Sequence, residues 1–372
     1  MKWNWQQKDW PDFSYEPKAL IQREQSFLQS SGVLFGAYKH LGEDDKSELT
    51  VSLISEEAYK TSEIEGEILN RDSVKSSVRK EFGLQADTKK ASPAETGIAA
   101  MMVDVYISWE SPLSKASLCS WNKMLLKGRR DLADTGCFRT HTDPMQVVSG
   151  ALEKPTIHFE APPSNNIPKE MTTFLKWFNN SHPKGKFSLP ALTRAGLAHL
   201  YFVSIHPFED GNGRIGRAVS EKALAQHLGR PSLIALAKTI EKNRKQYYQS
   251  LVLNNKDLEV TNWLTWFAET VLEAQDNSNA MLEFLIEKTK LYDRLSGKIN
   301  ERQQKVLARM FKEGADGFKG GLSAGNYISI TKTASSTATR DLQDLVEKGA
   351  LIRTGERRHM RYFLAVQVKR KQ

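Results

Sequence analysis

The sequence is poor in cysteine, because its 372 residues include only Cys119 and Cys137. Two cysteines cannot form a disulfide framework or a cysteine-rich metal cluster, and such a composition is typical of the reducing cytoplasm. No apolar stretch approaches the length of a membrane span, and the first residues lack the apolar run of a signal peptide. Internal repeats and low-complexity tracts are also absent. We therefore expect a cytoplasmic protein with no membrane partner.

The composition that remains is that of an ordinary globular protein with excess positive charge. Hydrophobic residues make up 40% and charged residues 26% of the chain, and its length allows two or three domains. The net charge of +9 is unevenly spread. Residues 353–372 contain seven Lys or Arg against one Glu, so this end contributes +6 of the +9.

One segment of twelve residues, 206–217, combines a histidine, carboxylates, a glycine-rich turn and two arginines in the sequence HPFEDGNGRIGR. Apolar residues of 189–205 recur at a 3.6-residue period, which predicts a helix before it. Pro207 should end that helix, and residues 211–213 should form a tight left-handed turn. A second helix is expected from Arg214, so that the free N–H groups at its start can bind an anion.

Three chemical roles follow from these residue types. His206 is the one side chain in the segment that can accept a proton near neutral pH, which makes it a candidate general base. Asp210 offers the hard oxygen that Mg²⁺ prefers when it also binds substrate phosphates. Arg214 and Arg217 lie three residues apart, on one side of the second helix, where their guanidinium groups can bind phosphates.

The same segment has two other interpretations. Gly211, Gly213 and Gly216 match the GxGxxG pattern of dinucleotide-binding folds, but that pattern requires a preceding strand and a βαβ unit, whereas a helix is expected here. A plain helical corner with charged surface residues is the other interpretation. It leaves the combination of His206, Asp210 and two arginines unexplained.

The segment resembles the signature of the Fic family, HPFx(D/E)GNGRxxR, at every defined position. This resemblance implies a mostly α-helical fold of the Fic type and transfer of AMP from ATP to a Ser, Thr or Tyr hydroxyl of a target protein, which can be the chain itself. His206 would deprotonate the hydroxyl, Asp210 would hold Mg²⁺, and Phe208 would anchor the loop. Backbone amides of Gly211, Asn212 and Gly213 would form the anion hole. The ATP-binding set would be Glu65, His206, Gly211, Asn212, Gly213, Arg214, Ile215, Gly216, Arg217, Arg244 and Tyr247.

A second segment lies near the N-terminus, where residues 61–66 should close a helix with Gly66 as its C-cap. Glu65 would face the negative end of the helix dipole, so it needs a cation such as Arg217, or else it is simply a solvated acid. Thr61, Glu65 and Gly66 also resemble the Fic inhibitory motif, (S/T)xxxE(G/N). That resemblance implies that Glu65 pairs with Arg217 and blocks the ATP γ-phosphate. It leaves open a reverse reaction that removes AMP.

Two further segments are expected to border the site. Residues 145–148 and 156–159, around Gly150 and Pro155, predict a hairpin. In the Fic family such a hairpin, the flap, binds the target by strand addition, here through Gln146, Val147 and Val148. The alternative is a simple surface hairpin. A helix opened by residues 243–248 would place Arg244 and Tyr247 near an adenine pocket, although Tyr247 also suits the rim of the core.

The C-terminal end has the pattern of a winged helix. Helices are expected at 302–313 and at 335–348, the latter capped by Ser335 or Ser336, followed by strands at 350–353 and 360–364. The second helix would be the recognition helix, and the basic hairpin would contact phosphates of DNA. Winged helices also bind proteins, so both partners stay open.

Three regions result: 1–90, helical, with an aromatic N-terminal arm and the inhibitory motif; 91–278, the Fic catalytic core; and 279–372, winged-helix-like. We expect an autoinhibited protein adenylyltransferase that uses ATP and Mg²⁺. The rival hypothesis is a DNA-binding transcriptional regulator whose Fic core senses nucleotide. The sequence leaves open whether the chain forms a homodimer.

Overall fold

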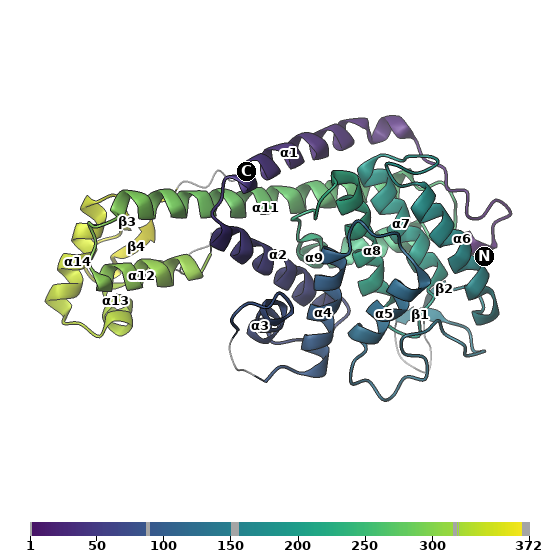
Figure 1. Cartoon of the computed structure of the whole chain (residues 1–372), viewed down its shortest axis with the longest axis horizontal. Coiled ribbons are helices and arrows are strands. Elements are labelled where there is room, and N and C mark those ends of the chain that lie inside the picture. The colour runs from purple at the N-terminus through teal and green to yellow at the C-terminus, as the bar shows by residue number, and fades with distance from the viewer. Residues whose placement is uncertain (1, 87–89, 150–155, 315–317, 319, 367–372) are drawn as a thin grey trace. The chain divides into compact units, whose positions relative to one another are not determined.

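The computed structural model describes residues 2–86, 90–149, 156–314, 318 and 320–366, and these residues are mostly α-helical, which confirms the predicted fold class (Figure 1). Within the described residues, no helix is both long and apolar enough to cross a bilayer. The helices are α1 (Ile21–Lys39), α2 (Glu43–Ile64), α3 (Arg71–Glu81), α4 (Pro93–Ile107), α5 (Lys115–Leu125), α6 (Ile167–Asn180), α7 (Ala191–Ile205), α8 (Asn212–Leu228), α9 (Leu236–Lys242), α10 (Arg244–Leu253), α11 (Thr261–Leu295), α12 (Glu301–Lys312), α13 (Ala324–Thr331) and α14 (Ser335–Glu347). Short 3-10 helices cover Asn4–Gln6, Pro17–Ala19, Ser164–Asn166 and Arg357–His359. The strands are β1 (Gln146–Ser149), β2 (Thr156–Glu160), β3 (Leu351–Thr354) and β4 (Arg361–Leu364).

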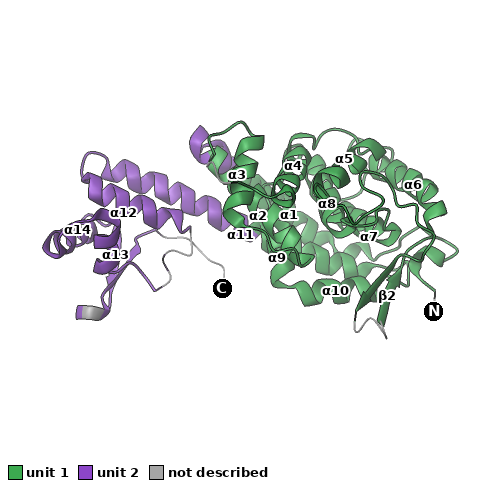
Figure 2. Cartoon of the chain, turned by 90° about the horizontal axis from the view of Figure 1, so that it is seen from below, with its two compact units in different colours: residues 1–35, 46–275 green, residues 36–45, 276–372 purple. Residues whose placement is uncertain are grey.

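Contacts divide the chain into two units, residues 1–35 with 46–275 and residues 36–45 with 276–372 (Figure 2). The first unit ends at Gln275, close to the boundary expected after residue 278, and both positions lie inside α11 rather than in a loop. Residues 1–90 and 91–275 share the first unit, apart from residues 36–45. The division into three regions stays a prediction.

The first unit is built around α7, which packs along α8. Every residue of α7 except Val203 is buried. The helix predicted over 189–205 is therefore present, and it is buried nearly all round because other helices surround it. Three of its buried polar side chains have partners: Thr193 is bonded to Glu24, Arg194 to Gln226 and His199 to Tyr247.

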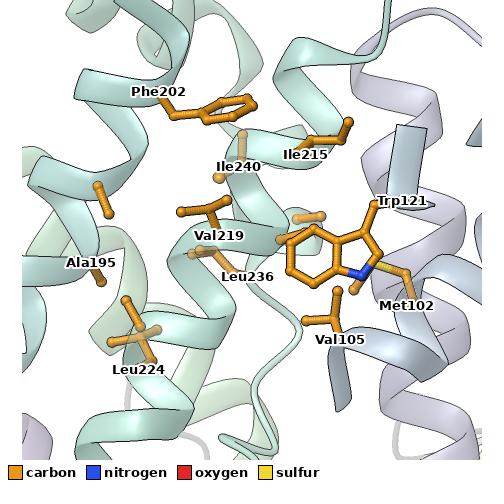
Figure 3. Packing of buried hydrophobic residues seen from close by; sticks show 14 of the residues in the cluster. Met102, Val105, Trp121, Ala195, Phe202, Ile215, Val219, Leu224, Leu236 and Ile240 are labelled. Atoms are coloured by element: carbon orange, nitrogen blue, oxygen red, sulfur yellow. The ribbon is translucent and has the colours of Figure 1, made fainter. Parts of the chain in front are cut away.

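Apolar side chains from four helices hold α8, and therefore the loop before it, in place. Figure 3 shows Trp121 of α5 and Met102 of α4 close to the α8 side chains, with Phe202 of α7 in the same cluster. Ile215 and Val219 of α8 are completely buried in it. Burial of a large apolar side chain contributes about 1.5–3 kcal/mol, so the start of α8 is held rigidly.

The aromatic N-terminal arm packs on this unit as expected. The Trp10 ring meets Tyr201 of α7 edge-on, with centroids 5.1 Å apart. Asn4 donates a hydrogen bond to Ser204 of the same helix at 2.8 Å. Trp5 donates to the backbone oxygen of Glu160 at the end of β2. The arm therefore joins α7 to the β1–β2 hairpin.

The second unit has its own core of apolar side chains from α11, α12 and α14 with β3, such as Leu291, Leu307, Leu342 and Leu351. The predicted helices and strands of this end are present, and β3 pairs antiparallel with β4. One detail was wrong: the N-cap of α14 is Ala334, since Ser335 is already its first helical residue. The winged-helix assignment stays a prediction. Lys369, Arg370 and Lys371 of the basic end lie outside the described residues.

Candidate nucleotide-binding active site

The loop between α7 and α8 is held by two residues with left-handed backbone conformations. His206 ends α7 with φ +51°, and Gly211 precedes α8 with φ +89°. Asn212 fixes the turn between them, because its side chain accepts from Phe208 N at 2.9 Å and donates to Phe208 O at 2.7 Å. Phe208 is completely buried, as expected of an anchor. The expected left-handed turn through Asn212 and Gly213 is wrong, since α8 already begins at Asn212.

A cavity of about 320 Å³ opens beside this loop. It is bordered by the loop, the flap strands, α10 and the end of α2. The expected site residues that line it are Glu65, Gln146, Val147, His206, Asp210, Gly211, Asn212, Gly213 and Tyr247. The start of α8 therefore faces an open space in which its free N–H groups can meet an anion.

The hydrogen bonding of His206 determines which ring nitrogen carries its proton. Nδ1 lies 3.2 Å from the backbone oxygen of Val203. A carbonyl can only accept, so Nδ1 is the protonated nitrogen and Nε2 keeps its lone pair. Burial, and to a lesser degree the positive charge of Arg139, lower the pKa of His206 to about 4. The ring is therefore neutral and able to accept a proton at neutral pH.

Arg217 is buried and bound by the end of α2 through three hydrogen bonds. Its Nε donates to Thr61 Oγ1 at 2.7 Å, and its Nη2 donates to the Thr61 backbone oxygen at 2.9 Å and to Glu65 Oε1 at 2.7 Å. Burial alone would lower the pKa of Arg217, but the nearby Glu65 carboxylate raises it. Gly66 lets the chain turn here, with φ +84°. The expected pairing of Glu65 with Arg217 is present.

Glu65 also lies directly over the first turn of α8. A Cβ atom built on Gly213 would be 2.2 Å from Glu65 Oε1, so only glycine allows this approach. The carboxylate thus sits at the positive end of the helix, where an anion is stabilised by the dipole and by free N–H groups. Glu65 occupies the place that a phosphate group would take.

Arg214 and Asp210 are paired with other protein groups as well. Arg214 Nη1 donates to Glu67 Oε2 at 2.7 Å, and its Nη2 lies 3.3 Å from Asp210 Oδ1. Arg129, in the segment after α5, donates to Asp210 Oδ2 at 2.9 Å. Each charged group expected to hold phosphate or metal therefore has an opposite charge bound to it.

Asp210 nevertheless suits a magnesium ion that binds together with a nucleotide. Its carboxylate lines the cavity and is about one-third exposed. Within the part of the chain that the structure describes, no group of three or more His, Cys, Asp and Glu could hold a metal ion. Mg²⁺ characteristically takes one or two carboxylates and completes its shell with phosphate oxygens and water. A single carboxylate beside an anion site fits that requirement.

The family models match two segments of the chain. Residues 112–224 match the Fic/DOC family, and residues 3–84 match a domain of unknown function (DUF4172). The chain is a Fic-domain protein. The first match contains the loop, the flap and both α8 arginines, whereas the second contains Glu65 and Glu67.

Proteins similar to this chain agree with the assignment. Over 117 residues it is 31% identical to Protein adenylyltransferase Fic of Drosophila melanogaster and 32% identical to that of Drosophila virilis. Each alignment covers 31% of this chain and only 22% of the relative. Among solved structures, a Fic family protein from Desulfovibrio desulfuricans G20 is 18% identical, with 97% of this chain and 99% of that one covered and a TM-score of 0.55. Fic-1 of C. elegans is 21% identical, and the match covers 74% of this chain and 75% of that one with a TM-score of 0.51. At these identities the structures show a shared fold.

The flap of the Fic domain is the antiparallel hairpin of β1 and β2, in which Val147 pairs with Phe159 and Val148 with Ile157. It is a two-stranded sheet in the described ranges, and the outer edge of β2 is covered, because His158 O accepts from Asn255 and Glu160 O accepts from Trp5. The free edge is therefore that of β1. Val147 and Val148 are exposed, whereas Gln146 is partly buried and bonded to Glu160. Gly150 and Pro155 of the expected turn lie outside the described residues.

Several residues that were expected in the site do not line the cavity. Ile215 is completely buried in the core, and Gly216 packs against Val203 and His199. The side chains of Arg214 and Arg217 are buried and bound to Glu67 and Glu65, respectively. Arg244 is exposed, and its guanidinium lies 5.8 Å from the ring centroid of Tyr248. Val148, Thr61 and Gly66 also lie outside the lining.

Tyr247 is buried and connects the base of the site to the core. Its hydroxyl lies 2.9 Å from His199 Nε2 and 3.4 Å from Arg217 Nη1. Burial raises its pKa, so the hydroxyl stays protonated. Its neighbour Tyr248 donates to the backbone oxygen of Ile64, the last residue of α2. Tyr248 therefore contacts segment 61–66 directly, whereas Tyr247 is connected to it through Arg217.

Sequence reasoning missed three charged residues of the site: Glu67, Arg129 and Arg139. Glu67 was within reach, because it is an acid two residues after Glu65 in the same turn. Arg129 and Arg139 meet the loop from more than 65 positions away. Their local sequence contains no spacing that would indicate this contact.

Proposed function

We propose that this chain is a Mg²⁺-dependent protein adenylyltransferase that transfers AMP from ATP to a hydroxyl side chain of a target protein. The observation that most supports the proposal is the neutral His206, with its Nε2 lone pair available beside an anion site at the start of α8. A general base must be unprotonated and must lie where the reacting hydroxyl can reach it. The relatives named protein adenylyltransferase support the same reaction.

In the proposed reaction, the target hydroxyl oxygen forms a bond to the α-phosphorus of ATP, and the bond from that phosphorus to the bridging oxygen breaks. His206 Nε2 takes the hydroxyl proton, and pyrophosphate leaves. The amides at the start of α8 and the two arginines stabilise the negative charge, which provides most of the acceleration in such transfers. Asp210 would hold Mg²⁺, which neutralises phosphate charge when bound.

We propose that the conformation described is an inhibited one. Glu65 covers the anion site and binds Arg217, while Glu67 binds Arg214 and Arg129 binds Asp210. ATP in the productive pose must displace both glutamates, and a metal on Asp210 must displace Arg129. We propose that Glu65 and Glu67 act together as an inhibitory pair at the end of α2. Removal of AMP, with Glu65 positioning a water, is the reverse reaction that the same geometry allows.

The target is proposed to dock on the flap. A free strand edge can add an extended peptide through backbone hydrogen bonds. Exposed Val147, Val148 and Ile157 offer apolar contact beside it. Because Met145 to Val147 and Phe159 also line the cavity, a peptide on this edge passes close to His206.

The proposal is tested by incubating the full chain with Mg²⁺ and ATP labelled either at the α- or at the γ-phosphorus. Wild type, Glu65→Gly and the matched control Glu63→Gln are compared, since Glu63 lies on the same helix but pairs with Lys60. AMP transfer places the α-label on protein and leaves the γ-label free, most strongly in Glu65→Gly. Transfer of the γ-label, or of neither label in all three proteins with candidate targets present, would overturn it.

A second candidate function, DNA binding, belongs to the second unit. Ser336, Thr339 and Arg340 are exposed on α14, and Arg353 and Arg357 are exposed in and after β3. These groups can contact phosphate oxygens. Fluorescence anisotropy of the full chain with duplex DNA should show affinity that falls steeply with salt. Binding that is absent or indifferent to salt rejects this function.

A further inference from the structure

Arg139 is a buried cation without an acidic partner. It lies in the segment between α5 and the flap, and only 2% of its surface is exposed. Among the ion pairs of the described residues, none involves Arg139, and burial lowers its pKa to about 10. Burying an unpaired charge is costly, so such a residue persists only where its hydrogen bonds are needed.

The three donor groups of this guanidinium hold three separate pieces of backbone or side chain. Nε donates to the backbone oxygen of His206 at 2.8 Å, and Nη1 donates to Ser164 Oγ at 2.7 Å. Nη2 donates to the backbone oxygen of Pro162. The backbone N–H of Arg139 adds a hydrogen bond to Pro207 O at 3.0 Å. Arg139 therefore binds both His206, which carries the base, and Pro207, which follows it.

The contact with His206 matters because the backbone of that residue is strained. A non-glycine residue at φ +51° is disfavoured and persists only when its surroundings hold it. The backbone N–H of His206 bonds to Phe202 O at 3.0 Å, which fixes one side of the residue. Arg139 fixes the carbonyl on the other side. The direction of the imidazole depends on both.

The remaining contacts of Arg139 reach the flap. Pro162 follows β2 by two residues, and the residue between them, Ala161, donates to Met145 O just before β1. Ser164 donates in turn to His141 O, on the chain leading into β1. The guanidinium therefore bonds directly to His206 on one side and to Pro162, just after the flap, on the other.

We propose that Arg139 is a positioning residue that fixes His206 relative to the flap, so that a hydroxyl docked on the flap meets the base at reacting distance. Its positive charge has a second effect, because it adds to burial in disfavouring the protonated form of the nearby ring. This inference rests on the proposed adenylyl transfer. The titratable groups that face the ring across the cavity are Glu65, His158, Glu209, Asp210, Tyr247 and Tyr248.

The test compares Arg139→Lys, Arg139→Gln and Ser164→Ala in the full chain with Glu65→Gly as background. Lysine keeps the charge, but its single nitrogen cannot reach three acceptors that are spread around a planar guanidinium, so kcat should fall about 10- to 100-fold while KM for ATP changes little. Glutamine also removes the charge, so the midpoint of the acid limb of kcat/KM should move to higher pH as well. Ser164→Ala removes a single partner and should lower kcat only a few-fold.

Two results would overturn the inference. One is kcat unchanged in both Arg139 variants while each remains folded by circular dichroism. The other is an equal loss in both variants at every pH with no shift of the acid midpoint in Arg139→Gln, which would indicate a purely structural role. NMR titration of the His206 ring needs no turnover, so it tests the effect of Arg139 even if Glu65→Gly transfers no AMP. If Glu65→Gly transfers no AMP, the proposed adenylyl transfer is rejected, but the titration still tests whether Arg139 affects the His206 ring.

Discussion

Glu65 Oε1 and Arg217 Nη2 lie 2.7 Å apart, where the end of α2 meets the first turns of α8. Arg217 is almost fully buried, whereas Glu65 remains about 29% exposed on the cavity side. The arginine cannot turn toward a ligand without losing this partner and Thr61. Under the proposed function, nucleotide binding should therefore require release of the end of α2 through this one ion pair.

Glu67→Gln should increase ATP affinity beyond the effect of Glu65→Gly. It frees Arg214, whose Nη1 then becomes available to a phosphate. Because Glu67 is partly exposed, the gain should be modest, about 3- to 10-fold when added to Glu65→Gly. Isothermal titration calorimetry with ATP and Mg²⁺ measures it, with Glu63→Gln as the matched control. Equal affinity with and without Glu67 would show that Arg214 is not restrained.

Arg129→Gln should strengthen divalent metal binding. The substitution removes the guanidinium from Asp210 Oδ2 and leaves that oxygen open to a cation. Because both groups are partly exposed, we expect a rise in affinity of about 3- to 10-fold. Binding of Mn²⁺ followed by electron paramagnetic resonance in the presence of ATP measures it. Arg130→Gln is the control, and lower affinity in Arg129→Gln than in the control would contradict the assignment.

The loop and the inhibitory pairing were predictable from sequence, because their chemistry is local. His206, Asp210 and the arginines share twelve residues, and Glu65 follows a recognisable pattern ending in Gly66. The rest depended on packing. The burial of α7 on all sides requires neighbours from α6, α8 and α11, and the pairing of Asp210 with Arg129 requires a chain reversal that no local spacing reports. Asn212 falls within the predicted left-handed turn, yet it is helical and its side chain holds Phe208 through two hydrogen bonds.

The His206 ring should remain neutral well below the pH at which an ordinary histidine becomes protonated. Its pKa is lowered to about 4, first by burial. The base is active when neutral, so activity should stay level as the pH falls from 8 to about 5.5 and decline only below that. NMR titration of the ring and kcat/KM of Glu65→Gly test this together. A ring pKa near 6.5 would contradict the environment described for it.

Glu57→Gln should make the protein more stable at alkaline pH. Burial and the nearby Glu221 raise the pKa of Glu57 to about 8, so the folded state holds a proton that the unfolded state releases near pH 4.5. Stability from this group is present at low pH and lost as the pH rises through 8. Urea unfolding should show the variant gaining about 3–4 kcal/mol relative to wild type between pH 5 and 8. A difference that does not change with pH would reject the shift.

The most direct test of the central claim compares Glu65→Gly with Glu65→Gly/His206→Ala for both ATP binding and transfer of the α-label to protein. The account predicts that both variants bind ATP with similar affinity, and that only the variant with His206 labels protein. Labelling at the same rate without the imidazole would contradict the role of His206 as the base.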